Sequence, residues 1–176
     1  MRKVIAYELL SLDGVAEDPN EFFPDWDDVM DANLARVIST QDTVLLGRRM
    51  YDEWSVFWPP SDIEPFASFI NGVEKFVATS TQPAQSWSNA TVIDRDFAKF
   101  VGDLKLTPGG DIGVHGSIAL CQSLLELGLV DGLRLVIAPA IQVKGRKLFD
   151  GGVPTRWTLE NQVASPTGYL LLDYRL

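Results

Sequence analysis

The feature that most constrains the fold is a short apolar run that passes through a small-residue turn directly into an amphipathic segment. Residues 111–116 read Asp-Ile-Gly-Val-His-Gly, and residues 117–128 continue with apolar side chains at helical spacing. This pattern predicts a strand followed by a helix, with Ser117 as N-cap and Gly128 as the left-handed C-terminal cap. A helix that begins in such a turn presents unpaired backbone N–H groups, which bind anions. The junction therefore predicts a phosphate site.

A second junction of the same kind lies upstream. Residues 44–46 (Val-Leu-Leu) predict a buried strand, Gly47 permits a tight turn or the close approach of a ligand, and a helix is expected from Arg48. Arg48 and Arg49 would then stand at a helix N-terminus, where the macrodipole disfavours positive charge. Local conflicts of this kind are commonest at functional sites, and a bound anion would relieve this one. The alternative is that both arginines are simply solvated.

A third strand end carries hydroxyl side chains. The strand expected over 75–79 runs into Ser80 and Thr81, and Pro83 ends it. These hydroxyls could bind a phosphate or could satisfy the backbone of a turn. Because ligands of open α/β sheets gather at the carboxyl ends of the strands, three such ends in one chain predict a shared anion site.

The remaining pattern predicts an α/β chain. Helices are expected over 26–39, 48–54 and 64–71, after Asp94 as a cap, and after Ser117; further strands are expected over 3–10, 43–47, 91–93, 132–138, 157–163 and 169–175. Pairing of the last two strands would make the sheet mixed. The long loop over 11–24 could serve as a lid. With neither repeats nor a linker, residues 1–176 are expected to form a single domain.

Composition narrows the function classes. The chain has 24 acidic against 15 basic residues and a formal net charge of −9, so nucleic acid and anionic membranes are poor partners. One cysteine and one histidine exclude the common metal constellations, and no metal is expected. Cys121 is expected to be a buried core residue and not a nucleophile. No stretch has the length of a membrane span and no signal peptide is recognised, so a cytoplasmic location is expected.

Several segments resemble the dihydrofolate-reductase-like superfamily. Leu45–Arg48 followed by Met50–Glu53 is similar to the LLGRxTYE signature, although Met50 replaces its threonine, and Ser11–Gly14 is similar to the SLDG after the first strand. The resemblance is closest to the bacterial branch related to the C-terminal reductase domain of the riboflavin-biosynthesis deaminase/reductase. Further matching segments follow in the expected order, so that the resemblance covers nearly the whole chain: Gly109–Ile112, His115–Ser117, Leu124–Leu125, Gly128–Asp131 and Lys147–Phe149.

This resemblance implies a three-layer α/β/α domain with a dihydrofolate-reductase-like mixed sheet. It also implies an NADPH-dependent reductase similar to 5-amino-6-(5-phosphoribosylamino)uracil reductases, acting on a small heterocyclic substrate as a homodimer. The apolar runs Leu133–Ile137 and Leu170–Leu172 also suggest a dimer, since they offer more apolar surface than one monomer hides. Two alternatives stay open: a pterin- or dihydrofolate-type reductase, and a non-catalytic NADP(H)-binding homodimer.

The resemblance also implies cofactor contacts. The residues near the cofactor phosphates would be Gly47, Arg48, Arg49, Ser80 and Thr81. The residues that support the pyrophosphate and nicotinamide would be Gly113, Gly116, Ser117 and Ile118. The nicotinamide would be bordered by Ser11, Asp13 and Gly14. His115 is expected beside the ligand as a hydrogen-bonded residue, with acid–base catalysis as the alternative. The Gly116–Ser117 peptide is expected to be cis or distorted and to lie beside Gly47.

The catalytic acid is the least constrained part of the site. Hydride transfer to a polar double bond needs a proton from elsewhere, and Asp31 lies where folate-reducing relatives keep a carboxylate. Asp27 and Asp31 form an i,i+4 pair of like charge, which could raise the pKa of one of them. The alternative is that both belong to the acidic first turns of a solvated helix. Asp13 is a second candidate for the acid.

Overall fold

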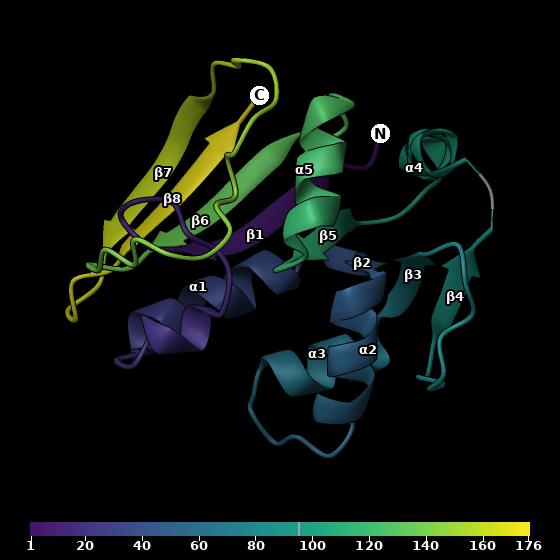
Figure 1. Cartoon of the computed structure of the whole chain (residues 1–176), viewed down its shortest axis with the longest axis horizontal. Coiled ribbons are helices and arrows are strands. Elements are labelled where there is room, and N and C mark those ends of the chain that lie inside the picture. The colour runs from purple at the N-terminus through teal and green to yellow at the C-terminus, as the bar shows by residue number, and fades with distance from the viewer. Residues whose placement is uncertain (95) are drawn as a thin grey trace.

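A single mixed sheet of eight strands organises the computed structural model, which describes residues 1–94 and 96–176 (Figure 1). Its strands are β1 (Val4–Leu10), β2 (Gln41–Gly47), β3 (Glu74–Ala78), β4 (Ala90–Ile93), β5 (Asp111–His115), β6 (Gly132–Ile137), β7 (Thr158–Ala164) and β8 (Leu170–Arg175). The order is β4-β3-β2-β5-β1-β6-β8-β7. The first six strands in this order are parallel, whereas β8 is antiparallel to both β6 and β7. The predicted mixed α/β sheet is confirmed.

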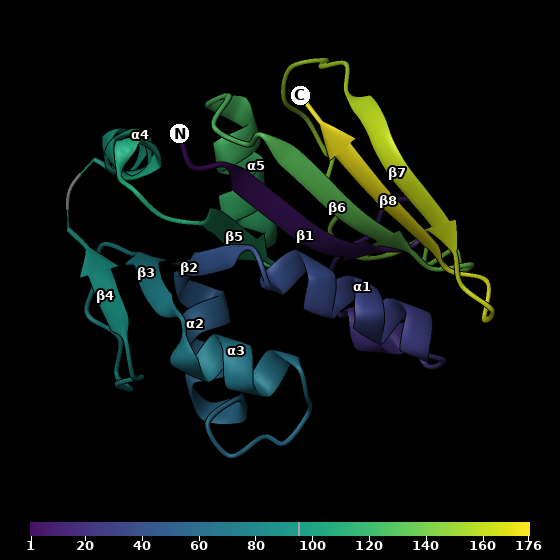
Figure 2. The same ribbon diagram turned by 180° about the vertical axis from the view of Figure 1, so that it is seen from behind.

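Helices cover both faces of the sheet. They are α1 (Asp28–Ile38), α2 (Arg48–Phe57), α3 (Phe66–Gly72), α4 (Phe97–Leu106) and α5 (Ile118–Glu126), with a 3₁₀ turn, η1, at Pro19–Glu21. Figures 1 and 2 show α4 and α5 on one side of the sheet and α1, α2 and α3 on the other. The three-layer arrangement that the resemblance implies is therefore present.

The two layers enclose two separate cores. Side chains of β1 alternate between them, because a central parallel strand is buried on both faces. Ile5 and Tyr7 belong to the core under α1, α2 and α3, whereas Val4 and Ala6 belong to the core under α4 and α5. This alternation decides which residues can meet at the site.

Several helix boundaries differ from the sequence prediction by two or three residues, and two of them have a clear physical reason. Helix α2 continues to Phe57, three residues beyond the expected end, because Trp54 packs edge-on against Phe66 of α3 and anchors the start of the last turn to the core. Helix α4 is capped by Asp96, whose carboxylate accepts a hydrogen bond from the Lys99 backbone N–H at 2.8 Å. The prediction of Asp94 as the cap is wrong.

Candidate functional site

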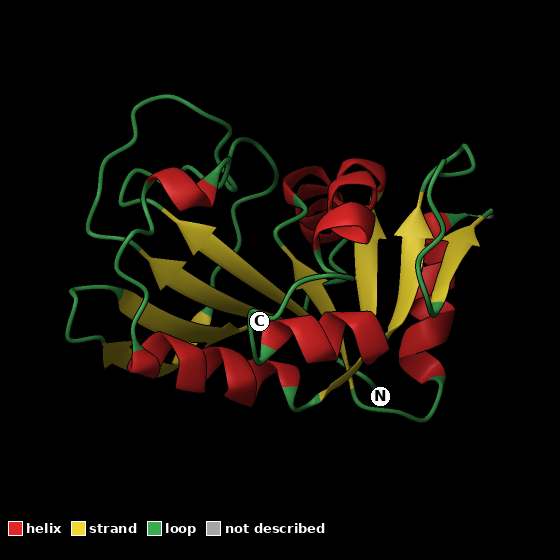
Figure 3. Cartoon of the chain, turned by 90° about the horizontal axis from the view of Figure 1, so that it is seen from below, coloured by secondary structure: helices red, strands yellow, loops and turns green. Residues whose placement is uncertain are grey.

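The three strand ends predicted to bind an anion belong to neighbouring strands. Strands β3, β2 and β5 are consecutive in the sheet and parallel, so their carboxyl ends lie along one edge (Figure 3). Gly47, the last residue of β2, pairs with Ala78, the last residue of β3. The sequence therefore predicted correctly that these three junctions meet.

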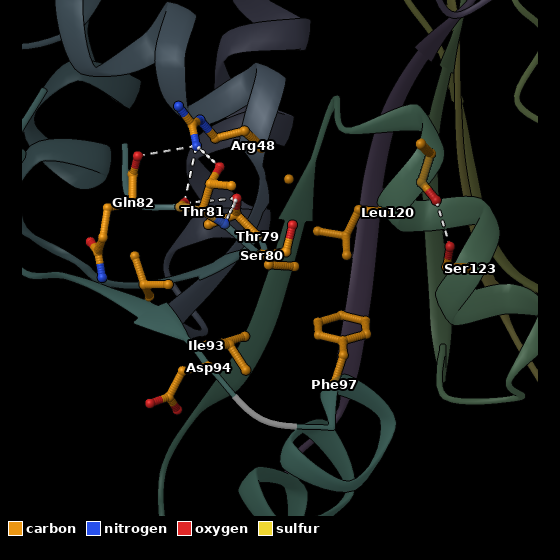
Figure 4. Close-up of a pocket in the computed structure, with 14 residues that line it drawn as sticks. Arg48, Thr79, Ser80, Thr81, Gln82, Ile93, Asp94, Phe97, Leu120 and Ser123 are labelled. Atoms are coloured by element: carbon orange, nitrogen blue, oxygen red, sulfur yellow. Dashed lines mark hydrogen bonds between the residues drawn. The ribbon is translucent and has the colours of Figure 1, made fainter. Parts of the chain in front are cut away.

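A cleft of about 780 Å³ opens at this edge (Figure 4). Its walls come from the junction after β2, the loop after β3, the end of β4, and helices α4 and α5. The lining residues are Gly47, Arg48, Ala78, Thr79, Ser80, Thr81, Gln82, Val92, Ile93, Asp94, Phe97, Ala119, Leu120 and Ser123. Polar groups lie on the Arg48 side and apolar side chains such as Phe97 and Leu120 lie opposite, which suits a ligand with a charged part and a flat part.

Gly47 and Ser117 join two of the junctions directly. The Gly47 backbone N–H donates to Ser117 Oγ at 3.2 Å, and a Cβ on Gly47 would lie only 2.6 Å from that oxygen. Ser117 stands at the N-cap position of α5, as predicted, but its side chain makes no capping hydrogen bond. The first-turn N–H groups of α5 therefore lack a side-chain acceptor among the described residues, and this end of the helix can receive an anion.

Arg48 connects α2 to the loop after β3. Its Nη1 donates to Thr81 Oγ1 at 2.6 Å and to the carbonyl oxygens of Thr81 and Gln82 at 3.0 and 3.3 Å, while its Nε pairs with Asp52 at 2.7 Å (Figure 4). These bonds hold a guanidinium against the wall of the cleft, where it also lines the open space. The arginine thus supplies positive charge locally in an acidic chain.

Arg49 lies away from the cleft. Its side chain is 68% exposed and pairs with Glu53 at 3.1 Å and with Glu17 at 3.7 Å. It is absent from the described lining of the cleft. The two arginines, adjacent in sequence, therefore stand in different environments: Arg48 lines the cleft, whereas Arg49 does not.

The turn between β5 and α5 differs from the expectation in one respect. The cis peptide bond among the described residues is Glu64–Pro65, so the Gly116–Ser117 peptide is trans and the cis form of the prediction is wrong, whereas its place beside Gly47 is confirmed. Gly116 instead turns the chain with a φ of 64°, a conformation that glycine adopts without strain. Met50 Cε lies 3.2 Å from where a Cβ on Gly116 would stand.

Gly113 and His115 lie in the interior of the protein, where they contact each other and Gln41. His115 is buried, and its Nε2 lies 2.8 Å from Gln41 Oε1. A Cβ on Gly113 would overlap that glutamine oxygen, so the glycine provides room for the Gln41–His115 pair. Burial lowers the pKa of His115 to about 3, and its ring packs against Tyr7 and Phe66 in the core opposite the cleft. The hydrogen bonding expected of His115 is confirmed, whereas neither residue lines the cleft and their cofactor contacts stay predictions.

Asp13 anchors a loop. Its carboxylate accepts hydrogen bonds from Ser11 Oγ at 2.7 Å and from the backbone N–H groups of Gln142 and Val143 at 3.0 Å each. The bond from Ser11 and those from the backbone lower the pKa of Asp13 to about 2. Asp13 is therefore ionised near neutral pH and cannot donate a proton there, which corrects its candidacy as the acid. The neighbouring Gly14 has a φ of 83° and allows the turn.

The carboxylates of α1 lie on the opposite side of the sheet from the cleft. Asp27 caps the helix, and a hydrogen bond from Thr167 lowers its pKa to about 2, so the expected like-charge effect does not raise it. Asp31 is half-buried and accepts a hydrogen bond from Trp26 Nε1 at 2.7 Å.

The burial of one carboxyl group was not predicted from the sequence. Glu8 in β1 is 1% exposed and lies in the α4–α5 layer beside Cys121, which is itself buried as predicted. Burial raises the pKa of Glu8 to about 8, against the smaller opposing effect of the Cys121 hydrogen bond. The available signal was a charged residue inside the apolar run Val-Ile-Ala-Tyr-Glu-Leu-Leu.

The described part of the chain contains neither a metal-binding cluster nor a membrane-spanning helix. No group of three His, Cys, Asp or Glu side chains is arranged to hold a metal ion within residues 1–94 and 96–176. In the same residues, every helix is too short or too polar to cross a membrane.

Comparison with known proteins identifies a matching family and a relative of this chain. The family model for the RibD C-terminal domain matches residues 2–171. The uncharacterised protein YyaP of Bacillus subtilis is 30% identical over 154 residues, covering 84% of this chain and 80% of that protein.

Solved structures show the same fold. A diaminohydroxyphosphoribosylaminopyrimidine deaminase/5-amino-6-(5-phosphoribosylamino)uracil reductase from Thermotoga maritima has a TM-score of 0.71 at 16% identity, over 99% of this chain and 56% of that one. A dihydrofolate reductase from Enterococcus faecalis, complexed with NADP(H), has a TM-score of 0.65 at 14% identity, over 98% of this chain and 95% of that one. The dihydrofolate-reductase-like fold predicted from the sequence is confirmed.

Proposed function

Because the chain belongs to the RibD C-terminal domain family, we propose that it is an NADPH-dependent reductase similar to 5-amino-6-(5-phosphoribosylamino)uracil reductases. The observation that carries this proposal is the cleft where Arg48 and the uncapped first turn of α5 stand on either side of Gly47. Both groups are positive in a chain whose net charge is −9, which favours an anionic ligand at this place.

The residues of the cleft fit NADPH part by part. Arg48, Ser80 and Thr81 offer a guanidinium and two hydroxyls to the 2′-phosphate, and the first turn of α5 beside Gly47 offers backbone N–H groups to the pyrophosphate. Apolar side chains such as Ile93, Phe97 and Leu120 form a surface for the adenine ring. When bound, this cofactor supplies a hydride.

The proton that accompanies reduction needs a donor on the substrate side. Asp31 is our candidate, because it is half-buried and, by the resemblance, lies where folate-reducing relatives keep a carboxylate. The indole N–H of Trp26 holds the carboxyl group in place at 2.7 Å. This same placement favours a pterin- or dihydrofolate-type reductase as the second candidate, since a half-buried carboxyl can bind and protonate a flat heterocycle.

A binding titration followed by a substrate screen tests the proposal. We expect NADPH to quench the tryptophan fluorescence of the protein at lower concentration than NADH does. Carbonyl, pyrimidine and pterin substrates are then screened for loss of the nicotinamide absorbance. Turnover of a phosphoribosylaminopyrimidine supports the riboflavin-type activity, turnover of a pterin supports the alternative, and binding without turnover supports a non-catalytic NADP(H)-binding protein. Failure of both nucleotides to bind would overturn the proposal.

A further inference from the structure

An aspartate or asparagine stands directly before a glycine at four places in the chain: Asp13–Gly14, Asn71–Gly72, Asp131–Gly132 and Asp150–Gly151. At such a pair the backbone nitrogen of the glycine can attack the carboxyl or amide carbon of the preceding side chain, because glycine has no Cβ to hinder the approach. The reaction needs a side chain and a peptide that are free to rotate towards each other. The folded environment of each pair therefore decides which of the four reacts.

Two of the aspartates are held by hydrogen bonds. The Asp13 carboxylate accepts hydrogen bonds from the Ser11 hydroxyl and from two backbone N–H groups. The Asp131 carboxylate accepts a hydrogen bond from the Val4 N–H at 2.8 Å and pairs with Lys105 Nζ at 2.7 Å. Turning either carboxyl group towards the next backbone nitrogen would break these contacts, which makes the attack unfavourable.

Asn71 is also held, although its chemistry makes it the most reactive of the four residues. A side-chain amide is a better electrophile than an ionised carboxylate, so the residue types alone rank the Asn71–Gly72 pair first. In the structure, however, Asn71 Nδ2 donates to the Trp58 carbonyl at 2.8 Å and Asn71 Oδ1 accepts from Trp87 Nε1 at 2.9 Å. Gly72 is the last residue of α3, so the attacking nitrogen is fixed as well. Sequence and structure thus predict different orders of reactivity.

Asp150–Gly151 is the pair that lacks such contacts. Residues 149–156 are exposed and belong to neither a helix nor a strand. The Asp150 carboxylate and the Gly151 N–H have no hydrogen-bond or ion-pair partner within residues 1–94 and 96–176. Gly151 and Gly152 have φ values of 104° and 85°, and a Cβ on either would meet nothing within 4 Å. Exposed glycine-containing loops of this kind are the least constrained parts of a folded chain.

We propose that Asp150 is a modification site at which the Asp150–Gly151 peptide isomerises to an isoaspartyl link. The Gly151 nitrogen forms a bond to Cγ of Asp150 while the Cγ–OH bond breaks, and the hydroxyl leaves as water with the amide proton, which gives a succinimide. Water then adds to the ring carbonyl that came from the main chain, and the bond from that carbonyl to nitrogen breaks. The chain now continues through the side-chain carbon and carries a free α-carboxylate. The water lost in the first step is regained in the second, so no other reactant is consumed.

The isomerised loop has the chemistry that a protein isoaspartyl methyltransferase recognises. Such an enzyme transfers a methyl group from S-adenosylmethionine to the free α-carboxylate of the isoaspartyl link, and the exposed loop leaves that group accessible. Asp150 lines a second groove of about 680 Å³ together with Trp157 and part of α5, whereas none of residues 148–156 is among the described lining of the cleft beside Gly47. The modification is therefore independent of the proposed function.

Aged protein tests the inference, because trypsin places the four pairs on separate fragments: residues 4–36, 50–75, 106–134 and 148–156. One sample is kept folded at neutral pH and one is unfolded in guanidinium chloride, until all four fragments of the unfolded sample contain isoaspartate. The isomer is measured in each fragment by methyl transfer from labelled S-adenosylmethionine with a protein isoaspartyl methyltransferase. Asp150→Glu, whose longer side chain does not form the succinimide, is the negative control, and Asp150→Asn, with its more reactive amide, is the positive control.

We expect the folded protein to contain isoaspartate in fragment 148–156 and none in the other three fragments, whereas the unfolded chain should form it fastest at Asn71. Asp150→Glu should lose the signal in fragment 148–156, and Asp150→Asn should acquire it sooner than wild type. Three results would each overturn the inference: absence of isoaspartate from fragment 148–156 of the folded protein, its appearance in another fragment of the folded protein as early, or a signal in fragment 148–156 that persists in Asp150→Glu.

Discussion

At the scale of single residues, the most unusual group is the Glu8 carboxyl in the middle of a buried strand. Its pKa is raised from an ordinary 4.5 to about 8 by burial, so the folded protein holds a proton there that the unfolded chain releases at lower pH. Cys121, the titratable group that faces it, has a raised pKa and stays neutral in the same range. Glu8 therefore couples stability to pH.

The sign of this coupling leads to a prediction. Between pH 5 and 8 the folded state binds more protons at Glu8 than the unfolded state, so the free energy of unfolding should fall as pH rises. Glu8→Gln should remove this dependence and gain on the order of a few kcal/mol over wild type at pH 8. Urea unfolding at several pH values measures it. Asp13→Asn is the control, because the lowered pKa of Asp13 contributes stability that is lost only as pH falls below about 4 towards 2. Parallel pH profiles for wild type and Glu8→Gln would contradict the prediction.

Residue roles were only partly predictable from the sequence. Arg48 could be identified as a candidate binding residue because a cation at a helix N-terminus is unfavourable unless an anion binds there. The hydrogen-bond partners of Asp13 and His115 could not be predicted, because Val143 and Gln41 are far away in sequence. No local pattern shows that a carboxylate will receive backbone N–H groups from a distant loop.

At the scale of elements, the junction between β2 and α5 holds the site together. The Gly47 N–H reaches Ser117 Oγ because neither a side chain on Gly47 nor a capping bond of Ser117 stands in the way. This contact fixes the first turn of α5 beside the start of α2. The positive ends of the two helices consequently lie at one edge of the sheet.

Substitution of Gly47 tests this contact. A Cβ at this position would lie 2.6 Å from Ser117 Oγ, so Gly47→Ala should turn the Ser117 hydroxyl away, break its hydrogen bond with the backbone N–H of residue 47 and lower the free energy of unfolding by about 1 kcal/mol. NADPH affinity should fall as well. Gly72→Ala is the matched control, because nothing lies within 4 Å of its added Cβ at the end of α3. It should be neutral or slightly stabilising in the same urea unfolding measurement. An unchanged free energy of unfolding in Gly47→Ala would contradict this prediction.

The elements themselves were largely predictable, because each follows from local hydrophobic spacing. Parallel strands buried on both faces read as apolar runs, and the carboxyl ends of β2, β3 and β5 carried recognisable small and hydroxyl residues. What local spacing could not reveal is the face on which each element packs. The sequence therefore did not show that α1, which carries Asp31, and α5, which lines the cleft, cover opposite faces of the sheet.

At the scale of the whole molecule, the antiparallel end of the sheet is poorly covered. Every residue of β7 is exposed, and Leu159, Val163 and Leu170 keep 40 to 44% of their surface accessible. In contrast, Leu133, Leu135 and Val136 of β6 are buried within the monomer, which corrects their expected role as free apolar surface. We therefore base the proposed homodimer on β7 and β8, since an exposed apolar edge strand is a common site of association.

Light scattering tests the proposed dimer. The particle mass at micromolar concentration should be about twice the 19.5 kDa of the chain. Leu170→Lys places a charge on the exposed part of β8 and should shift the mass towards that of the monomer, whereas Val56→Lys, on the exposed surface of α2, should not. A wild-type mass equal to that of one chain would exclude the homodimer.

The central claim is that the cleft beside Gly47 holds the 2′-phosphate of NADPH, and the ratio of NADPH to NADH affinity tests it most directly. Arg48 lines the cleft, whereas Arg49 is exposed and paired with Glu53, so the two adjacent arginines form a matched pair. Arg48→Ala should weaken NADPH binding about tenfold or more and change NADH binding little, because a charge-assisted contact contributes about 1.5–3 kcal/mol. Arg49→Ala should leave the ratio unchanged. Equal losses of both nucleotides in Arg48→Ala would show that this arginine does not recognise the 2′-phosphate and would contradict the account.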